Sequence, residues 1–334
     1  MALDEFGLIR RYFTRADHPL PAGVRLGIGD DAALLDLPPG ESLAVTTDTL
    51  VAGRHFPHDA LPFDIGWKAL AVNLSDLAAM GATPVGVTLA VTLPSADDAW
   101  LAAFAEGFFA LADAHGVPLI GGDTTRGPLS ITVTALGSVP FKQASRRDGA
   151  QPGDLIYVSG TLGDGGLGLA LAQGRLHDVH LPPLHQAHAL TRLHRPTPRL
   201  ALGLALRGIA SAAMDVSDGL VQDLGHLLKA SGRAKPLGAT LTLERLPLSP
   251  GMQYLAGEGD ALQRQVLDWA LAAGDDYELL FTLSVARQAQ VEALAQTLEL
   301  PLTQIGVVSA SPDVCLSWRA APYRHDELSG YRHF

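Results

Sequence analysis

The sequence predicts a two-domain α/β protein, and three observations support this fold class. The chain has 334 residues, 47% of them hydrophobic, which is enough for two domains of ordinary size. Strand-like and helix-like stretches alternate along both halves of the chain. A polar, turn-rich segment, SRRDGAQPG at 145–153, separates the halves. We therefore expect one domain over residues 1–148 and another over residues 149–334.

The first domain is expected to follow a β-α-β-α-β order, which fits a sheet with helices on one face. A strand over 42–45 leads into Thr46-Thr47-Asp48, and Leu119-Ile120 leads into GGDTTRG. The second helix is expected to start at Ser95 with Asp98 as a variant capping box, and to bury Leu101, Phe104, Phe108 and Leu111. The remaining predicted elements are a helix over 64–80 ended by Gly81, and strands over 84–93 and 130–139.

The second domain shows the same mixture of periodicities. Helices are predicted over 164–173 and 220–231, the latter capped by Ser217 or Asp218, with a further helix inside 176–199. A GDD turn follows residues 269–273. Strands are predicted over 154–159, 211–216, 304–309 and 314–318.

Charge and hydropathy exclude two classes of protein. The net charge of −11 argues against a nucleic-acid-binding protein, which needs a basic face. The first residues, MALDEFGLIRRYF, carry charges where a signal peptide needs an apolar core, and no apolar run is long enough to span a membrane. We therefore expect a cytoplasmic protein with no membrane partner.

Aspartates recur beside apolar runs in six separate segments. Burying a carboxylate without a partner is costly, so a shared set of divalent cations is an economical explanation. Any one of these acids alone is compatible with a helix cap or a turn. Thr46 and Thr47 add hydroxyls beside Asp48, while Asn73 shares a helix face with Asp76. Magnesium prefers such oxygen ligands, and the candidates are Asp30, Asp31, Asp48, Asp76, Asp123, Asp215 and Asp218.

Three further patterns leave alternatives open. GGDTTRG and the pair Arg146–Arg147 offer donors for a polyphosphate, although the arginines also suit a solvated linker. GDGGLG at 163–168 matches a dinucleotide motif, but no second strand follows its helix, which favours a glycine-rich turn packing near a nucleotide or only a tight strand-to-helix turn. Five histidines within 177–194 are compatible with zinc, but an exposed helix is the better interpretation.

The ordered set of motifs resembles the thiamine-monophosphate kinase family, within the wider aminoimidazole ribonucleotide synthetase-like group. The motifs are GIGDDAALL, TTDTLVAGRHF, KALAVNLSDLAAMGATP, LIGGDTTRGPLS, DVSDGL and GDDYELLF, and they span nearly the whole chain. The resemblance implies two α/β domains, with metal and ATP motifs in the first domain and the second completing the ATP and substrate site. It also implies a homodimer in which the N-terminal sheets pair into a barrel.

The resemblance implies an enzyme that transfers the γ-phosphoryl group of ATP directly to thiamine monophosphate, giving thiamine diphosphate with several Mg²⁺ ions and no covalent nucleophile. The implied metal ligands are Asp31, Thr46, Thr47, Asp48, Asp76, Asp123, Asp215 and Asp218. The implied ATP contacts are Gly122, Asp123, Arg147 and Ser217. The implied substrate contacts are His55, Asp275 and Tyr331, with Asp275 standing where the family commonly has glutamate.

Three other functions stay open at this point. One is an ATP-dependent cyclo-ligase of the aminoimidazole ribonucleotide synthetase type, which would share the nucleotide and metal groups. Another is a non-catalytic, metal-dependent nucleotide-binding protein, which would not need His55, Asp275 and Tyr331. A phosphohydrolase is a third option and would release inorganic phosphate instead of transferring it.

Overall fold

The computed structural model describes residues 5–15, 18–233 and 235–323, and the chain forms two compact units. Unit 1 comprises residues 1–77 and 82–142, and unit 2 comprises residues 78–81 and 143–334. Across the described ranges, no helix combines the length and apolar character that a membrane span requires.

Unit 1 is built on a four-stranded sheet in the order β3-β6-β4-β5. β6 pairs antiparallel with β3 and β4, whereas β5 joins β4 in parallel at one edge. The short elements α1, η1, β1 and β2 precede the sheet. Their bounds are α1 (Glu5–Leu8), η1 (Ile9–Phe13), β1 (Val24–Leu26) and β2 (Leu34–Leu35), and those of the sheet are β3 (Glu41–Val51), β4 (Thr83–Leu93), β5 (Leu119–Arg126) and β6 (Ser130–Pro140).

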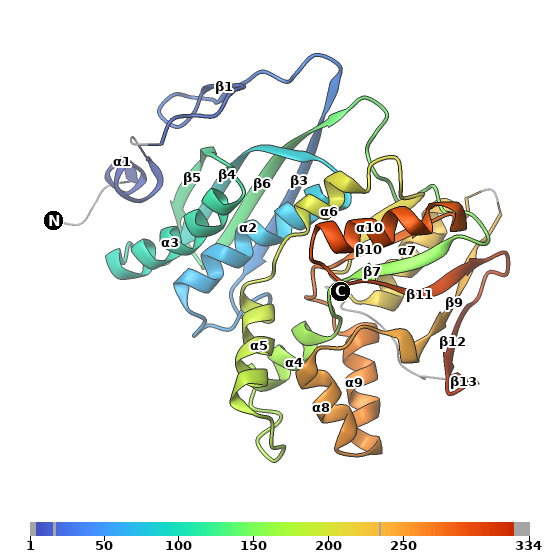
Figure 1. Cartoon of the computed structure of the whole chain (residues 1–334). Helices are drawn as coiled ribbons and strands as arrows, with labels where there is room; N and C mark the ends of the chain where they lie inside the picture. The colour runs from blue at the N-terminus through green and yellow to red at the C-terminus, as the bar shows by residue number, and fades with distance from the viewer. Residues whose placement is uncertain (1–4, 16–17, 234, 324–334) are drawn as a thin grey trace. The chain divides into compact units, whose positions relative to one another are not determined.

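Two helices, α2 (Pro62–Ala79) and α3 (Asp98–Ala114), cover one face of this sheet (Figure 1). The predicted apolar stripe of α3 is confirmed, since Leu101, Phe104, Phe108 and Leu111 are all buried. The two helices approach very closely through a pair of glycines. A Cβ on Gly66 would lie 2.1 Å from the carbonyl oxygen of Phe104, and one on Gly107 would lie 1.9 Å from that of Phe63. Only glycine permits this backbone contact.

Among the described residues of unit 1, no helix covers the opposite face of the sheet (Figure 1). Leu43, Val45 and Val51 on β3 are 47%, 58% and 37% exposed. Threonines from neighbouring strands line the same face, where the hydroxyls of Thr47 and Thr134 lie 2.9 Å apart. This open face, defined by Leu43, Val45, Thr47, Thr49, Val51, Thr132 and Thr134, is partly apolar.

Unit 2 contains a seven-stranded sheet in the order β13-β12-β9-β11-β7-β10-β8. The neighbours pair antiparallel, except that β12 and β9 run parallel. The strands are β7 (Leu155–Ser159), β8 (Ala212–Asp215), β9 (Gly238–Thr242), β10 (Leu279–Leu283), β11 (Leu302–Ser309), β12 (Val314–Trp318) and β13 (Ala321–Tyr323).

Helices cover both faces of this sheet. α7 (Leu220–Ser231) and α9 (Asp260–Ala272) pack into the large core beneath one face, and α10 (Gln288–Thr297) covers the other (Figure 1). A second apolar cluster holds α4 (Asp164–Ala172), α5 (Pro183–His194) and α8 (Pro250–Gly257) together. The short α6 (Leu200–Ala205) precedes β8.

Some element boundaries differ from the sequence-based expectation. Thr46-Thr47-Asp48 lie inside β3, not after it, and β5 continues from Leu119 through GGDTTR. The expected start of α3 was wrong, because its N-cap is Asp97, whose carboxylate accepts the Trp100 amide at 2.9 Å. Pairing with neighbouring strands explains the longer β3 and β5, since this contribution is invisible in local sequence.

Candidate active site

In unit 1, a pair of carboxylates lies between β3 and α2. Asp76 on α2 accepts a hydrogen bond from the Thr46 hydroxyl, and the Asn73 side chain accepts one from the Asp48 amide at 3.1 Å. The prediction that Asn73 and Asp76 share one helix face is therefore confirmed, because both contact β3. Asp48 is half-buried beside this pair of contacts.

Burial and the neighbouring charge of Asp76 disfavour the ionised form of Asp48. Burial, followed by the charge of Asp76, raises the pKa of Asp48 to about 6. Carboxylates, a hydroxyl and an amide oxygen gather here, and this donor set fits a hard divalent cation such as Mg²⁺.

Strand alternation separates some of the other predicted ligands of unit 1 from this pair. The Thr47 side chain points to the open face, so the expectation that both threonine hydroxyls lie beside Asp48 holds for Thr46 only. Asp123 is exposed on β5, in register with Ala90, Thr132 and Thr49. That row belongs to the open face, whereas Asp48 belongs to the covered one.

The loop that carries Asp30 and Asp31 is exposed at both acids, so the burial cost expected from their apolar neighbours does not arise. The Asp30 carboxylate accepts the Asp31 amide at 2.8 Å. His55, in the turn after β3, is half-buried and its Nδ1 accepts the Val51 amide at 3.0 Å. Gly122, at φ 152°, lets the Leu89 carbonyl come close, since a Cβ there would lie 1.9 Å from that oxygen.

Within the described residues, no group of three or more histidine, cysteine, aspartate or glutamate side chains is arranged to hold a metal. Within unit 1 the structure brings together one pair of acids, Asp48 and Asp76. Metal binding by Asp31, Thr46, Thr47, Asp48, Asp76, Asp123, Asp215 and Asp218 therefore stays a prediction.

In unit 2, two loops pair with each other and carry the remaining candidates. The Asp275 amide donates to the Ser217 carbonyl, and the Tyr277 amide donates to the Val216 carbonyl, both at 2.9 Å. The first loop, 216–219, follows Asp215 at the end of β8, and the second, 274–277, precedes β10. We call them together the paired loops. They bring Asp215, Ser217, Asp218 and Asp275 into one region of unit 2.

Sequence reasoning missed Asp223, which shapes the first of the paired loops. Its buried carboxylate accepts the backbone amides of Ser217, Asp218 and Gly219, each at 3.1 Å. The predicted cap of α7 by Ser217 or Asp218 is wrong, because neither side chain caps the helix. Burial raises the pKa of Asp223 to about 7. An acid in the first turn of a helix, four residues after a glycine, was the available signal.

Asp276 plays the corresponding part in the second of the paired loops. Its buried carboxylate accepts the amides of Gly163 at 2.8 Å and Gly165 at 3.1 Å, at the start of α4. Burial raises the pKa of Asp276 to about 8. The N-terminus of the GDGGLG helix is thus occupied by a side chain of the chain itself, which agrees with a tight strand-to-helix turn.

Beneath the paired loops lies a buried ion cluster around Glu278. This carboxylate has no exposed surface and accepts hydrogen bonds from Ser159 at 2.6 Å, Arg199 Nε at 2.7 Å and Arg192 at 3.0 Å. The same Arg192 nitrogen donates to the Asp276 carbonyl at 2.6 Å. The cluster ties α5 and the segment before α6 to the start of β10.

The remaining predicted site residues lie in the linker, at the C-terminal end and in the histidine-rich segment. Arg147 is exposed, and its carbonyl accepts the Ser231 hydroxyl at 2.8 Å. Arg146 pairs with Asp148 instead of forming a double clamp with Arg147. Tyr331 lies outside the described residues. The histidine-rich segment forms α5 and its approach, where His188 lies 3.6 Å from the buried Asp164.

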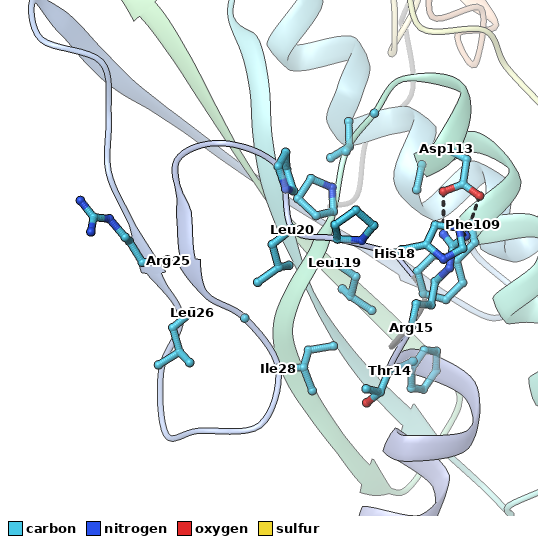
Figure 2. Close-up of a pocket in the computed structure, with 18 residues that line it drawn as sticks. Thr14, Arg15, His18, Leu20, Arg25, Leu26, Ile28, Phe109, Asp113 and Leu119 are labelled. Carbon is cyan, nitrogen blue, oxygen red and sulfur yellow. Dashed lines mark hydrogen bonds and ion pairs between the residues drawn. The ribbon is translucent and has the colours of Figure 1, made fainter.

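None of these residues lines a pocket of about 890 Å³ in unit 1. The segment between η1 and β1 lines it together with α3 and β5, mostly through apolar side chains (Figure 2). At its rim Arg15 grips Asp113 through two hydrogen bonds of 2.6 and 2.9 Å and lies over the Phe109 ring. Because it contains none of the predicted ligands, we assign it no part in the chemistry.

Comparison of the sequence with known proteins identifies the family of this chain. Residues 29–139 match the family AIR synthase related protein, N-terminal domain, and residues 151–319 match its C-terminal domain. A thiamine-monophosphate kinase of Salmonella typhimurium is 48% identical over 100% of this chain and 99% of its own length. The chain belongs to the thiamine-monophosphate kinase family.

Solved structures of thiamine-monophosphate kinases agree with this family assignment. The enzyme from Stenotrophomonas maltophilia has a TM-score of 0.81 at 50% identity, covering 90% of this chain and 93% of that one. AaThiL complexed with AMPPCP and TMP has a TM-score of 0.75 at 30% identity, covering 90% and 89%. The predicted two-domain, aminoimidazole ribonucleotide synthetase-like fold is thereby confirmed.

Proposed function

We propose that this protein is a thiamine-monophosphate kinase, which uses ATP to convert thiamine monophosphate into thiamine diphosphate. The observation that carries the proposal is the 48% identity to a kinase of this name over the whole chain. A relative of the same fold was solved with AMPPCP and TMP together, which supports an ATP-like nucleotide and a phosphorylated acceptor as the two substrates.

The chemistry we propose is direct transfer. A phosphate oxygen of thiamine monophosphate forms a bond to the γ-phosphorus of ATP, the bond to the bridging oxygen breaks, and ADP leaves. Such transfers depend on positioning and charge neutralisation rather than on a protein nucleophile. Bound Mg²⁺ would supply that neutralisation. Asp48 and Asp76, the acid pair of unit 1, are the best-supported holders of Mg²⁺, because burial and then the charge of Asp76 raise the pKa of Asp48.

The proposed nucleotide contacts are Gly122, Asp123, Arg147 and Ser217, and the proposed acceptor contacts are His55, Asp275 and Tyr331. Among them, Ser217 and Asp275 have the strongest structural support, because a backbone hydrogen bond joins them within the paired loops. Asp275 carries a carboxylate that suits the positively charged thiazolium ring of the acceptor.

The test is a comparison of acceptors. With ATP and Mg²⁺, the protein is expected to form thiamine diphosphate and ADP in equal amounts from thiamine monophosphate, and to form no phosphorylated product from free thiamine. Chromatography of both products measures this directly. Release of inorganic phosphate without thiamine diphosphate would instead identify a hydrolase, and nucleotide binding without turnover would identify a sensor.

We also propose that the protein is a homodimer in which the open face of unit 1 is covered by a second copy. An apolar sheet face with Val45 58% exposed is a typical association surface. Val45→Glu is therefore expected to convert a dimer into a monomer in light scattering. Val285→Glu, at a 60% exposed position of unit 2, is the control and should leave the dimer intact. A monomeric wild-type protein would contradict the proposal.

A further inference from the structure

The second of the paired loops, Gly274–Tyr277, has an unusual backbone. Gly274, Asp275 and Tyr277 adopt positive φ angles of 71°, 59° and 50°. Glycine tolerates this region, but a bulky residue such as tyrosine rarely adopts it. Strained backbone of this kind persists only where the surrounding structure fixes it, and it concentrates at sites of function.

Asp276 lies between the two strained non-glycine residues and fixes them. Its Oδ2 accepts the Gly163 amide at 2.8 Å, its Oδ1 accepts the Gly165 amide at 3.1 Å, and only 2% of the residue is exposed. On the other side of the loop, the Asp275 amide donates to the Ser217 carbonyl. Asp275 is thus held between two rigid neighbours, the start of α4 and the loop 216–219.

The glycines of GDGGLG make this contact possible. A Cβ on Gly165 would lie 2.6 Å from the Gly274 carbonyl oxygen and 2.8 Å from the Asp275 carbonyl carbon. Any side chain at that position therefore displaces the loop that carries Asp275. The proposed function leaves the glycine-rich segment without a role. Its backbone amides donate the hydrogen bonds that hold the Asp276 carboxyl group.

We propose that Asp276 is a positioning residue for the acceptor substrate. Its two carboxylate oxygens accept backbone hydrogen bonds from the start of α4, and these bonds fix the orientation of Asp275. That orientation allows the Asp275 carboxylate to recognise the cationic thiazolium ring. This inference rests on the proposed function, because it assigns Asp276 a share in the binding of thiamine monophosphate and none in that of ATP. Asp276 acts only through Asp275 and does not touch the substrate.

Asp276→Asn tests the two hydrogen bonds to the Gly163 and Gly165 amides with almost no change in side-chain volume. Either oxygen of a carboxyl group can accept a hydrogen bond, protonated or not, whereas the NH₂ group of asparagine cannot. One of the two glycine amides therefore loses its acceptor. We expect the KM for thiamine monophosphate to rise about tenfold, as for one lost buried hydrogen bond, while the KM for ATP changes less than about twofold.

Two further variants make the comparison specific. Asp154→Asn is the matched control, because Asp154 is also buried and accepts the Gln151 amide at 3.0 Å, but precedes β7 at the opposite end of β10. Both KM values should stay unchanged in it. Asp275→Ala should raise the KM for thiamine monophosphate, and combining it with Asp276→Asn should add little, because both changes remove the same interaction.

The outcomes are distinct. Equal increases in both KM values, unchanged KM values, or fully additive effects with Asp275→Ala would overturn the positioning role while wild-type turnover upholds the proposed function. A wild-type protein that forms no thiamine diphosphate would overturn both. If Asp276→Asn does not fold, Gly165→Ala tests the same contact from the other side. Failure of both variants to fold would show that the contact is structural only, and would also overturn the inference.

Discussion

Asp48→Asn is expected to lower the rate of thiamine diphosphate formation by about a hundredfold or more while the protein stays folded. Asparagine keeps the shape of aspartate but removes one of the two charges proposed to hold Mg²⁺ between β3 and α2. The measurement is the rate of product formation over a range of Mg²⁺ concentrations. A rate close to that of the wild type at limiting Mg²⁺ would contradict the metal role of Asp48.

The same substitution is expected to stabilise the metal-free protein. The pKa of Asp48 is raised to about 6, so the folded state binds this proton more tightly than the unfolded state. The stability that the proton confers is therefore present at about pH 4 and is lost as the pH rises through about 6. Asparagine does not undergo this loss, so the variant should unfold at a higher temperature than the wild type above pH 6, and the difference should shrink towards pH 4.

A control on the same strand separates charge from position. Glu41→Gln, at the start of β3, also replaces a carboxylate by an amide, but far along the strand from Asp76. It should change neither the Mg²⁺ dependence nor the pH dependence of unfolding. Lower activity together with lower stability in Asp48→Asn would indicate a structural role for Asp48, against our prediction.

Glu278→Gln is expected to lower the free energy of unfolding by about 3 kcal/mol or more. The substitution leaves the guanidinium groups of Arg192 and Arg199 without their counter-charge in the interior of unit 2. It also changes the group that accepts the Ser159 hydroxyl at 2.6 Å. Breaking one member of a buried ion cluster costs more than the cluster contributes as a whole, because a desolvated charge remains behind.

Denaturant unfolding measures this loss of free energy of unfolding. The comparison requires that the slope of this free energy against denaturant concentration is the same in variant and wild type. Glu292→Gln is the control, since Glu292 on α10 is exposed and accepts the Gln288 side-chain amide at 3.1 Å, and its replacement should cost less than about 0.5 kcal/mol. A loss below about 1 kcal/mol in Glu278→Gln would show that solvent reaches the two arginines.

Local sequence predicted the elements whose pattern is local. The α3 stripe from Leu101 to Leu111 is buried because its spacing matches the helical period, and Asn73 and Asp76 share a face for the same reason. The motif order identified the family. None of these predictions required knowledge of which segments meet in space.

The missed features depend on contacts between distant segments. Asp223 and Asp276 each satisfy backbone amides, and no side-chain pattern shows which amides need a partner. β5 extends through GGDTTR because β4 pairs with it, although its glycines and polar residues favour a loop. Thr47 lies inside β3, where successive side chains point to opposite faces of the sheet, so its hydroxyl points away from Asp48. The sequence-based prediction ended this strand before Thr46 and therefore did not anticipate the difference.

The glycine pair between α2 and α3 has a consequence for how unit 1 tolerates change. Gly66 and Gly107 contact no proposed ligand, yet Gly66 belongs to the helix that presents Asn73 and Asp76 to β3. A methyl group at either glycine would push that helix away from its neighbour and alter the spacing of the two acids. A substitution at either remote position would therefore disturb the proposed magnesium site as well as the packing of the two helices.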